Sequence, residues 1–128
     1  MEFDHVAISV NKLEESIEYY TDHFGFVVDG KFEKPLIFLR FAFIKKENFR
    51  IELFEFKDKV EGRDDLTDLR IRGLRHLAFK VQDIKHSMDV LKNSGLSFGP
   101  VKSGTSCKYY AFTTDPNGVS IELYEPNK

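Results

Sequence analysis

The chain has a single cysteine, Cys107, and no long apolar run among its 128 residues. One cysteine cannot form a disulfide within the chain, which fits a reducing compartment, and we expect Cys107 to be an ordinary thiol near a loop. No apolar run approaches the roughly 18 residues that span a bilayer, and no basic segment with an apolar core opens the chain. These absences predict a soluble, cytoplasmic protein that does not bind a membrane.

The sequence also lacks an excess of charge of either sign. Its 19 Lys and Arg residues and 21 Asp and Glu residues are interspersed, and the formal net charge is -2. This distribution provides no basic surface for nucleic acid and no charged tail. The expected partner is therefore a small, neutral or weakly anionic molecule.

An internal repeat of about 70 residues is the main positive feature. Each half opens with a strand-like segment that carries a histidine, at His5 and His76, and closes with one that carries a glutamate, at Glu52 and Glu122. The histidines are 71 residues apart and the glutamates 70. Two copies are too few for a solenoid, so the repeat predicts one compact domain, residues 1–128, of two packed modules.

Both halves show the same order of elements, a strand, a helix and three further strands, which predicts an α+β fold. We expect Asn11 and Asp83 to cap the two helices, the first in a capping box with Glu14, and Gly25 and Gly95 to end them. Apolar residues at helical spacing, which should pack on a sheet, are Leu13, Ile17, Tyr20 and Phe24, and then Ile84, Met88 and Leu91. Later strands are expected at about 26–32, 36–45, 48–56, 96–101, 108–114 and 119–125. The modules should cover about 2–56 and 74–126, with a linker or mobile lid at 57–73.

Strand alternation predicts that the two histidines and two glutamates share a sheet face. Side chains two residues apart point the same way, and neighbours point in opposite directions. In the first strand Val6 and Ile8 should pack on a helix, so His5 points to the other face, and the same argument holds for the other three segments. Two imidazoles and two carboxylates on one face can bind a divalent cation, which also relieves the repulsion between the carboxylates. His23 and His86 have no such arrangement, and we expect them to be solvated.

Short motifs over nearly the whole chain carry a resemblance to a known superfamily. They are Asp4-His5-Val6-Ala7, Tyr19-Tyr20, Phe24-Gly25-Phe26, Ile51-Glu52-Leu53, Arg75-His76-Leu77-Ala78, and Asp115-Pro116-Asn117-Gly118 running into Ile121-Glu122-Leu123. In these motifs the chain resembles the vicinal oxygen chelate superfamily, which includes glyoxalase I, methylmalonyl-CoA epimerase, extradiol dioxygenases, fosfomycin-resistance enzymes and bleomycin-binding proteins. The resemblance implies two βαβββ modules whose curled mixed sheets form a metal-binding cleft, within one chain or across a homodimer.

The order His, Glu, His, Glu looks like glyoxalase I. Four protein ligands on a six-coordinate metal leave two positions for vicinal substrate oxygens, whereas the dioxygenases use two histidines and one carboxylate. In the family pattern the fosfomycin enzymes have three protein ligands, the bleomycin binders lack the metal set, and the epimerase typically carries an amide where Glu52 stands. The resemblance implies one divalent metal ion per site, with zinc or nickel before cobalt, manganese or iron. Its ligands would be His5, Glu52, His76 and Glu122.

The implied reaction removes a proton next to a carbonyl, while the metal stabilises the enediolate that forms. By analogy with glyoxalase I, Glu122 is the expected base and Glu52 its partner on the other face of the substrate, with His5 and His76 as anchoring ligands. We therefore predict a glyoxalase I-like lyase or isomerase that acts on a metal-chelated carbonyl or hemithioacetal. An epimerase resembling methylmalonyl-CoA epimerase and a non-catalytic small-molecule binding protein are the alternatives.

The side chains that hold glutathione in glyoxalase I are not matched in this sequence. Ser9 stands where an arginine would grip the glutathione carboxylate, and Phe56 stands where an asparagine is expected. A different thiol adduct, an acyl-CoA ester or another α-hydroxycarbonyl compound therefore stays open as the substrate. Residues expected to wall the pocket are Phe54 and Tyr124; candidates for meeting an anionic group are Arg40, Arg50, Lys108 and Tyr109; and Ser103-Gly104-Thr105 resembles a loop of bacterial glyoxalases.

Overall fold

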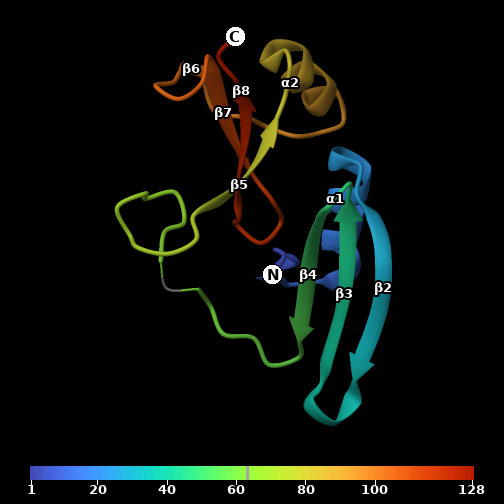
Figure 1. Cartoon of the computed structure of the whole chain (residues 1–128). Coiled ribbons are helices and arrows are strands. Elements are labelled where there is room, and N and C mark those ends of the chain that lie inside the picture. Colours follow the sequence, from blue (N-terminus) through green and yellow to red (C-terminus); the bar gives the residue numbers. More distant parts are fainter. Residues whose placement is uncertain (63) are drawn as a thin grey trace. The chain divides into compact units, whose positions relative to one another are not determined.

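The computed structural model describes residues 1–62 and 64–128. The chain divides into two compact units, residues 1–62 (unit 1) and 63–128 (unit 2). Each unit has one α-helix and a four-stranded mixed sheet, in the order strand, helix, three strands (Figure 1). This arrangement confirms the predicted α+β class with two βαβββ modules. Within the described residues, no helix is both long enough and apolar enough to cross a membrane.

Unit 1 contains the first strand and helix and three further strands. They are β1 (His5–Ser9), α1 (Leu13–Phe24), β2 (Val27–Lys34), β3 (Leu39–Lys46) and β4 (Phe49–Phe56). The strand order in the sheet is β1-β4-β3-β2. The pairing of β1 with β4 is parallel and the other two pairings are antiparallel. The strand that carries the histidine is therefore the direct neighbour of the strand that carries the glutamate.

Unit 2 repeats this topology. Its elements are β5 (His76–Lys80), α2 (Ile84–Asn93), β6 (Lys102–Ser103), β7 (Tyr109–Thr114) and β8 (Ser120–Glu125). The strand order is β5-β8-β7-β6, and β5 again pairs in parallel with the last strand. The predicted turn before β8 is present, because the Asp115 carboxylate accepts hydrogen bonds from the backbone N–H groups of Asn117 and Val119.

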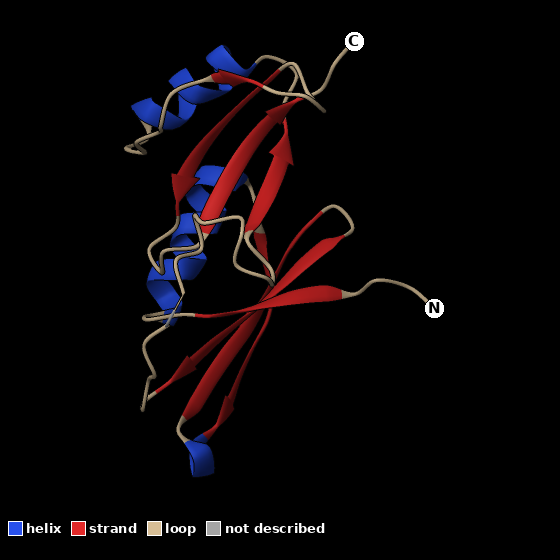
Figure 2. Ribbon diagram, turned by 90° about the vertical axis from the view of Figure 1, so that its left-hand side faces the viewer, coloured by secondary structure: helices blue, strands red, loops and turns tan. Residues whose placement is uncertain are grey.

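In each unit the helix packs against one face of its own sheet (Figure 2). The sheet side chains buried on these faces include Ile8, Ile51, Leu53, Ile121 and Leu123. The predicted helix stripes are confirmed for Leu13, Tyr20, Phe24, Ile84, Met88 and Leu91, whereas Ile17 is only half-buried. The burial pattern therefore agrees with the predicted alternation, and the histidines and glutamates belong to the sheet faces opposite the helices.

Each helix begins at a glutamate from the last strand of its own unit. The Glu55 carboxylate accepts a hydrogen bond from the backbone N–H of Leu13 at 2.7 Å. At the equivalent place in unit 2, the Glu125 carboxylate accepts one from the N–H of Ile84 at 3.0 Å. Each bond satisfies one of the N–H groups that the first helical turn leaves without a partner. The repeat therefore contains a second pair of equivalent glutamates, which has a structural role.

These glutamates explain why one predicted cap is wrong. The N-cap of α1 is Lys12, not Asn11, and its side chain makes no cap hydrogen bond. Asp83 caps α2 as predicted, by accepting a hydrogen bond from the N–H of His86. Gly25 ends α1 in the left-handed conformation with φ 72°, which glycine adopts without steric cost.

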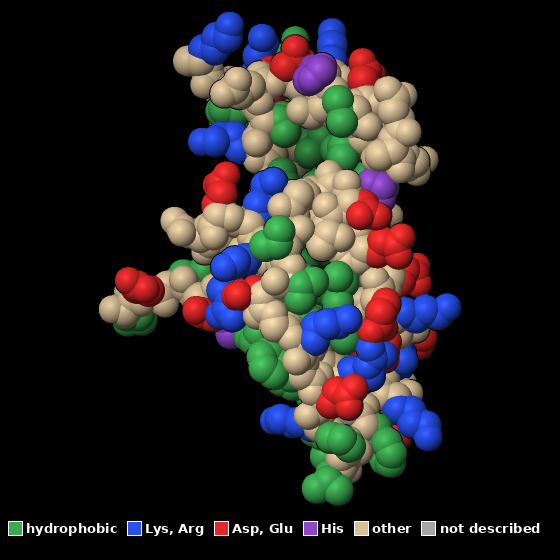
Figure 3. Space-filling view, turned by 90° about the vertical axis from the view of Figure 1, so that its right-hand side faces the viewer, with side chains coloured by type: hydrophobic (Ala, Val, Ile, Leu, Met, Phe, Trp, Pro, Cys, Tyr) green, Lys and Arg blue, Asp and Glu red, His purple; other side chains and the backbone are tan. Residues whose placement is uncertain are grey.

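The segment predicted as strand 36–45 begins differently in the structure. Residues Pro35–Ile37 form a 3-10 turn, η1, and Phe38 has a positive φ of 53°, so β3 starts at Leu39. Leu36, Ile37 and Phe38 are exposed, and hydrophobic side chains gather at this hairpin tip (Figure 3). An apolar run that resembles a buried strand therefore lies at the surface here.

The strand predicted at 96–101 is not formed. Gly99 donates one backbone hydrogen bond to the carbonyl of Phe112, but the next residue is Pro100, which has no N–H to donate. The regular ladder is limited to Lys102–Ser103, the two residues of β6.

Candidate metal centre

Each unit holds one histidine and one glutamate side by side. In unit 1, Nε2 of His5 on β1 lies 3.4 Å from Oε1 of Glu52 on β4. In unit 2, Nε2 of His76 on β5 lies 3.2 Å from Oε2 of Glu122 on β8. The parallel register causes this match, since each glutamate pairs with the alanine two residues after the histidine. The predicted ligands thus come together as two equivalent pairs.

The four side chains are partly shielded from solvent. The glutamates are 16% and 13% exposed, and the histidines 33% and 28%. Partial burial weakens the screening of charge by water, so a carboxylate here interacts more strongly with a nearby cation than it would at the surface.

Asp4 and Arg50 hold the ring of His5. The Asp4 carboxylate accepts a hydrogen bond from Nδ1 of His5 at 2.6 Å and another from Arg50 at 2.8 Å. Arg50 also donates to Asp29 at 3.2 Å. The hydrogen bond from His5, together with the Arg50 guanidinium, lowers the pKa of the Asp4 carboxyl below its usual range. Because a carboxylate can only accept, the proton of a neutral imidazole must lie on Nδ1, which leaves the lone pair on Nε2.

The donor chemistry of this pair fits a divalent metal ion. With Nδ1 donating to Asp4, Nε2 of His5 is an acceptor that faces the carboxylate of Glu52. Two acceptors at this separation repel each other unless a proton or a cation lies between them. Imidazole nitrogen with carboxylate oxygen is a common ligand set for first-row divalent metals, and a carboxylate that orients the imidazole is usual in such sites.

The histidine of unit 2 is held differently. Arg75 stands in the place of Asp4, and its guanidinium contacts the preceding segment, 2.6 Å from the Asp64 carboxylate and 3.3 Å from the carbonyl of Asp65. Nδ1 of His76 is buried, and the described residues offer it no hydrogen-bond partner. The two pairs therefore match in composition but differ in the support of their imidazoles.

A phenylalanine packs edge-on against each imidazole, which the sequence analysis did not anticipate. The ring centres of His5 and Phe43 are 5.1 Å apart with planes at 88°, and those of His76 and Phe112 are 5.3 Å apart at 78°. Phe43 pairs with Glu52 across β3 and β4, and Phe112 pairs with Glu122 across β7 and β8. A register fixed by the antiparallel hairpins therefore supplies the third member of each pair's surroundings.

Neither pair is a complete metal site by itself. Over residues 1–62 and 64–128, no three His, Cys, Asp or Glu side chains gather where they could hold a metal ion. A structural site usually requires four protein ligands and a catalytic site at least three. A metal centre built from these residues would therefore need both pairs.

The cationic residues that were candidates for contacting an anion are engaged within their own units. Arg40 forms ion pairs with Glu14 and Glu55. Arg50 is bound by the two aspartates already described, and Nζ of Lys108 lies 4.0 Å from the Glu125 carboxylate. None of the three is an unpaired cation within its own unit.

Other predicted residues have local roles in the structure. The ring of Phe54 lies 5.6 Å from that of Phe41 and 6.4 Å from that of Phe56. Tyr124 donates its hydroxyl hydrogen to the carbonyl of Ser106 at 2.6 Å, which ties β8 to the loop after β6. Ser9 is exposed at the end of β1.

The remaining histidines and the cysteine lie outside the two pairs. His86 is exposed as predicted, whereas His23 is half-buried against Tyr19, with ring centres 5.1 Å apart. Cys107 is only 3% exposed, and burial, with a smaller effect of the Glu122 charge, raises the pKa of its thiol.

A repeated βαβββ unit with one histidine and one glutamate beside each other on the sheet defines a class of paired-module proteins. The family model of the Glyoxalase/Bleomycin resistance protein/Dioxygenase superfamily matches residues 2–123. The chain therefore belongs to this superfamily, which is the vicinal oxygen chelate superfamily that its motifs resemble.

Two curated relatives match over nearly the whole chain. A probable lactoylglutathione lyase from Synechocystis sp. is 32% identical over 129 residues, which cover 94% of this chain and 92% of that protein. A mitochondrial methylmalonyl-CoA epimerase from Dictyostelium discoideum is 31% identical over 127 residues, which cover 95% of this chain and 76% of that protein. Proteins with different activities are thus similar to this chain at the same level of identity.

Solved structures agree with the fold. A glyoxalase family protein from Enterococcus faecalis matches with a TM-score of 0.83 and 26% identity, over 97% of both chains. FosX, a fosfomycin resistance protein from Listeria monocytogenes solved in complex with Mn(II), matches with a TM-score of 0.75 and 14% identity, over 98% of this chain and 92% of that one. The second similarity concerns the fold alone, and it shows that this fold can accommodate a divalent metal.

Proposed function

We propose that this chain is a metal-dependent lyase or isomerase of the glyoxalase I type. One divalent metal ion would be held by the two pairs together, His5 with Glu52 and His76 with Glu122. The observation that carries the proposal is the equivalence of the pairs, which have the same residue types, on equivalent strands, at 3.4 and 3.2 Å. When bound, the metal would polarise a substrate oxygen and stabilise the negative charge that develops beside it.

Glu122 is the proposed base for a proton next to the substrate carbonyl. A general base must be able to move and must lie within hydrogen-bond reach of the proton that it takes. His5 is fixed by Asp4, whereas His76 has no such partner among the described residues, so the unit 2 pair is the less constrained of the two. Glu52 would act on the opposite face of the substrate, and the better supported His5 would be the firmer anchor.

Glutathione is not supported as the substrate thiol. Ser9 offers no charge for a carboxylate, and Phe56 ends β4 as a partly exposed ring without an amide group. The nearby cations are paired with carboxylates of their own units. These features favour a carbonyl compound or thiol adduct that carries fewer charges than glutathione.

Epimerisation is the second candidate. A carboxylate on each face of the substrate can remove a proton from one face and return it on the other, as an epimerase requires. The 31% identity with the Dictyostelium epimerase supports this candidate. A protein that binds a small molecule without reaction is the third, and it would keep tight binding without proton exchange.

Metal content of the purified protein is the first test. Wild type and the variants Glu122→Ala and His76→Ala would be loaded identically with Zn, Ni, Co and Mn and analysed for metal. His86→Ala is the matched control, because His86 is an exposed histidine of the same unit. Close to one metal per site in wild type and in the control, and loss in both site variants, would support the chelate. Absence of specific metal from wild type would refute the enzyme proposal.

Deuterium exchange separates the catalytic candidates. The metal-loaded protein would be mixed with methylglyoxal hemithioacetals of several thiols and with acyl-CoA esters in D2O. Lyase activity gives a rearranged product, epimerisation gives deuterium in recovered substrate, and tight binding without either identifies a binding protein.

We also propose that the active form is a homodimer in the cytoplasm, with each site completed either within one chain or by units of two chains. Removing the metal with a chelator distinguishes these arrangements. A shift toward monomer in sedimentation analysis supports sites shared between chains, because metal binding and association are then linked, and an unchanged dimer supports sites within one chain.

A further inference from the structure

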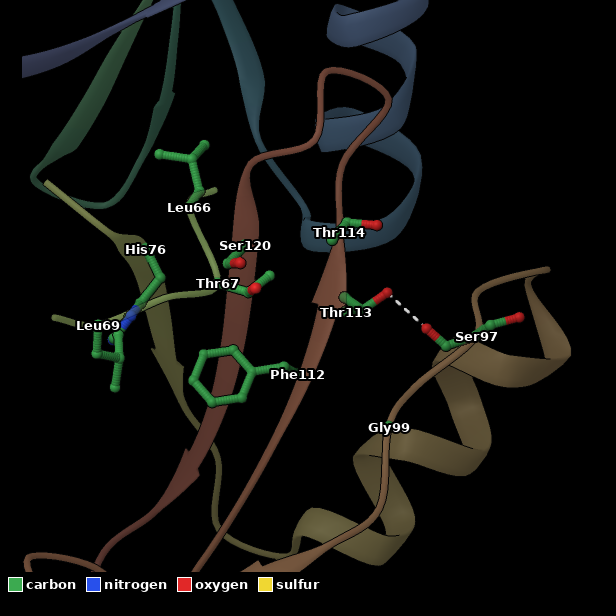
Figure 4. A pocket seen from close by; sticks show the side chains of 10 residues that line it. All are labelled: Leu66, Thr67, Leu69, His76, Ser97, Gly99, Phe112, Thr113, Thr114 and Ser120. Atoms are coloured by element: carbon green, nitrogen blue, oxygen red, sulfur yellow. Dashed lines mark hydrogen bonds between the residues drawn. The ribbon is translucent and has the colours of Figure 1, made fainter. Parts of the chain in front are cut away.

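A cavity of about 370 Å³ lies in unit 2 beside one of the proposed metal ligands. Its walls include His76, Phe112 and Ser120 from the sheet, and Leu66, Thr67 and Leu69 from the segment before β5 (Figure 4). This volume is near the lower end of the range for small-molecule sites, about 300–1,000 Å³. The cavity is therefore large enough for one side group of a substrate.

The lining of this cavity carries no acidic or basic side chain other than the imidazole of His76. Two of its hydroxyl groups are already used, since Thr67 donates to the Asp65 carboxylate at 2.6 Å and Thr113 donates to the carbonyl of Ser97 at 2.6 Å. Burying a charged group without a partner costs several kcal/mol or more. The cavity is therefore suited to an uncharged, mainly apolar group.

The segment that forms the outer wall is built into the unit. Arg75, only 11% exposed, binds Asp64 and the carbonyl of Asp65 at one end of the segment. Two successive turns follow, closed by the N–H of Asp68 on the carbonyl of Asp65 and the N–H of Ile71 on the carbonyl of Asp68. Since Arg75 directly precedes His76, the same strand end positions both the wall and the proposed ligand.

One side chain of this wall is apolar yet exposed. Leu69 lines the cavity and is 64% exposed, so a ligand group in the cavity would remove part of it from water. Removing apolar surface from water favours binding by roughly 25 cal/mol per Å². This gain is available only to a ligand that is itself apolar at that point.

We infer that Leu66, Thr67 and Leu69 form a specificity wall, and that the cavity behind it takes the uncharged, apolar side group of a substrate whose two oxygens are chelated at the metal. The inference rests on the proposed function, which it extends by naming the substrate class. The favoured substrates are carbonyl compounds or thiol adducts with an alkyl or aryl group close to the reacting carbon. A carboxylate or phosphate at the same place is excluded.

Hydroxamic acids test this inference, because they chelate metals through two neighbouring oxygens. Calorimetric titration of the zinc-loaded protein would compare acetohydroxamate, hexanohydroxamate and the monohydroxamate of adipic acid. Each buried methylene adds about fourfold in affinity, so the hexano compound should bind at least about tenfold more tightly than the aceto compound. The adipic compound has the same length with a terminal carboxylate, and it should lose this gain.

The variant Leu69→Gln should reduce the affinity ratio of the hexano to the aceto compound to less than about threefold. Leu74→Gln is the matched control, because Leu74 is an exposed leucine of the same segment that does not line the cavity. It should leave the ratio as in wild type. Equal affinities of the two hydroxamates in wild type, or equal effects of the two variants, would overturn the inference.

A second measurement separates this inference from the proposed function. Hexanamide has the apolar tail without the chelating group, so its binding can be followed by methyl NMR without any metal. Shifts of the Leu66 and Leu69 methyl signals, with Leu74 unchanged, support the apolar pocket even if no hydroxamate binds, and that combination would refute the metal site alone. No shift at Leu66 and Leu69, together with acetohydroxamate binding, would refute the pocket and leave the metal site.

Discussion

Asp4 accepts a hydrogen bond from Nδ1 of His5 at 2.6 Å, and so fixes the orientation in which this ring presents Nε2. Asp4→Asn should weaken metal binding by about 10- to 100-fold, because a primary amide supports the Nδ1–H tautomer less well than a carboxylate does. Competition with a chelator of known affinity measures this change. Glu2→Gln, at a nearby exposed carboxylate, is the control, and a similar loss in both variants would contradict the role of Asp4.

The cap that Glu55 gives to α1 can be tested by its effect on stability. Glu55→Ala should lower the free energy of unfolding by about 1–2 kcal/mol, because the N–H of Leu13 loses its acceptor. Glu55→Gln should cost less, since its amide oxygen can still accept. Urea denaturation gives both values. Glu18→Ala, at an exposed position of the same helix, should change stability little, and an equal loss there would argue against the cap.

Gly104 lies too close to its neighbours to carry a side chain. A Cβ atom there would overlap Sγ of Cys107 and would approach the Cys107 carbonyl oxygen to 3.2 Å and Cδ1 of Tyr110 to 3.3 Å. Gly104→Ala should therefore destabilise the protein by about 1–3 kcal/mol. Gly62→Ala meets no atom within 4 Å and should stay within about 1 kcal/mol of wild type. Thermal unfolding of the two variants provides the comparison, and equal midpoints would contradict the close packing.

The Cys107 thiol should react slowly in the native state. It is 3% exposed, and its pKa is raised chiefly by burial, so both access and thiolate are limited. A disulfide reagent that releases a coloured thiol should react at least about tenfold more slowly with folded than with urea-unfolded protein. A native rate equal to the unfolded rate would show that the thiol is accessible.

The raised pKa of Cys107 also predicts a loss of stability in alkaline solution. The unfolded thiol ionises first, from about pH 8.5, while the folded thiol stays neutral, so ionisation favours the unfolded chain. This contribution to folding is complete below that pH and is lost as pH rises through the folded pKa. Cys107→Ser should show a smaller decrease in the free energy of unfolding between about pH 8 and pH 10 than wild type, and identical pH profiles would contradict the prediction.

The repeat and the strand alternation were sufficient to predict the two modules and the sheet face of the four candidate ligands. Both signals are local periodicities, which depend only on the geometry of a helix or a strand. The sequence failed where a neighbour distant in the chain decides the local structure. Asn11 was expected to cap α1, but Glu55 supplies an acceptor from 42 residues away. Similarly, Phe43 and Phe112 could not be assigned to the histidines without the register of the hairpins.

Local chemistry also limited two strand predictions. Pro35 starts a 3-10 turn in an apolar run, and Pro100 removes a donor from the segment beside β7, so hydrophobicity alone overestimated both strands. The support of His5 by Asp4 was visible only as two adjacent letters. Its meaning emerged from Arg50, which lies next to them across the parallel pair.

The parallel pairing of the first and last strands has a consequence for the order of folding. His5 and Glu52 are 47 residues apart in the sequence, and His76 and Glu122 are 46 apart, so each pair forms only after a long loop has closed. The entropy of that closure is lost before any contact between the two residues can compensate for it. A metal ion that bridges them therefore acts on units whose topology is complete, and we expect it to slow unfolding far more than it accelerates folding.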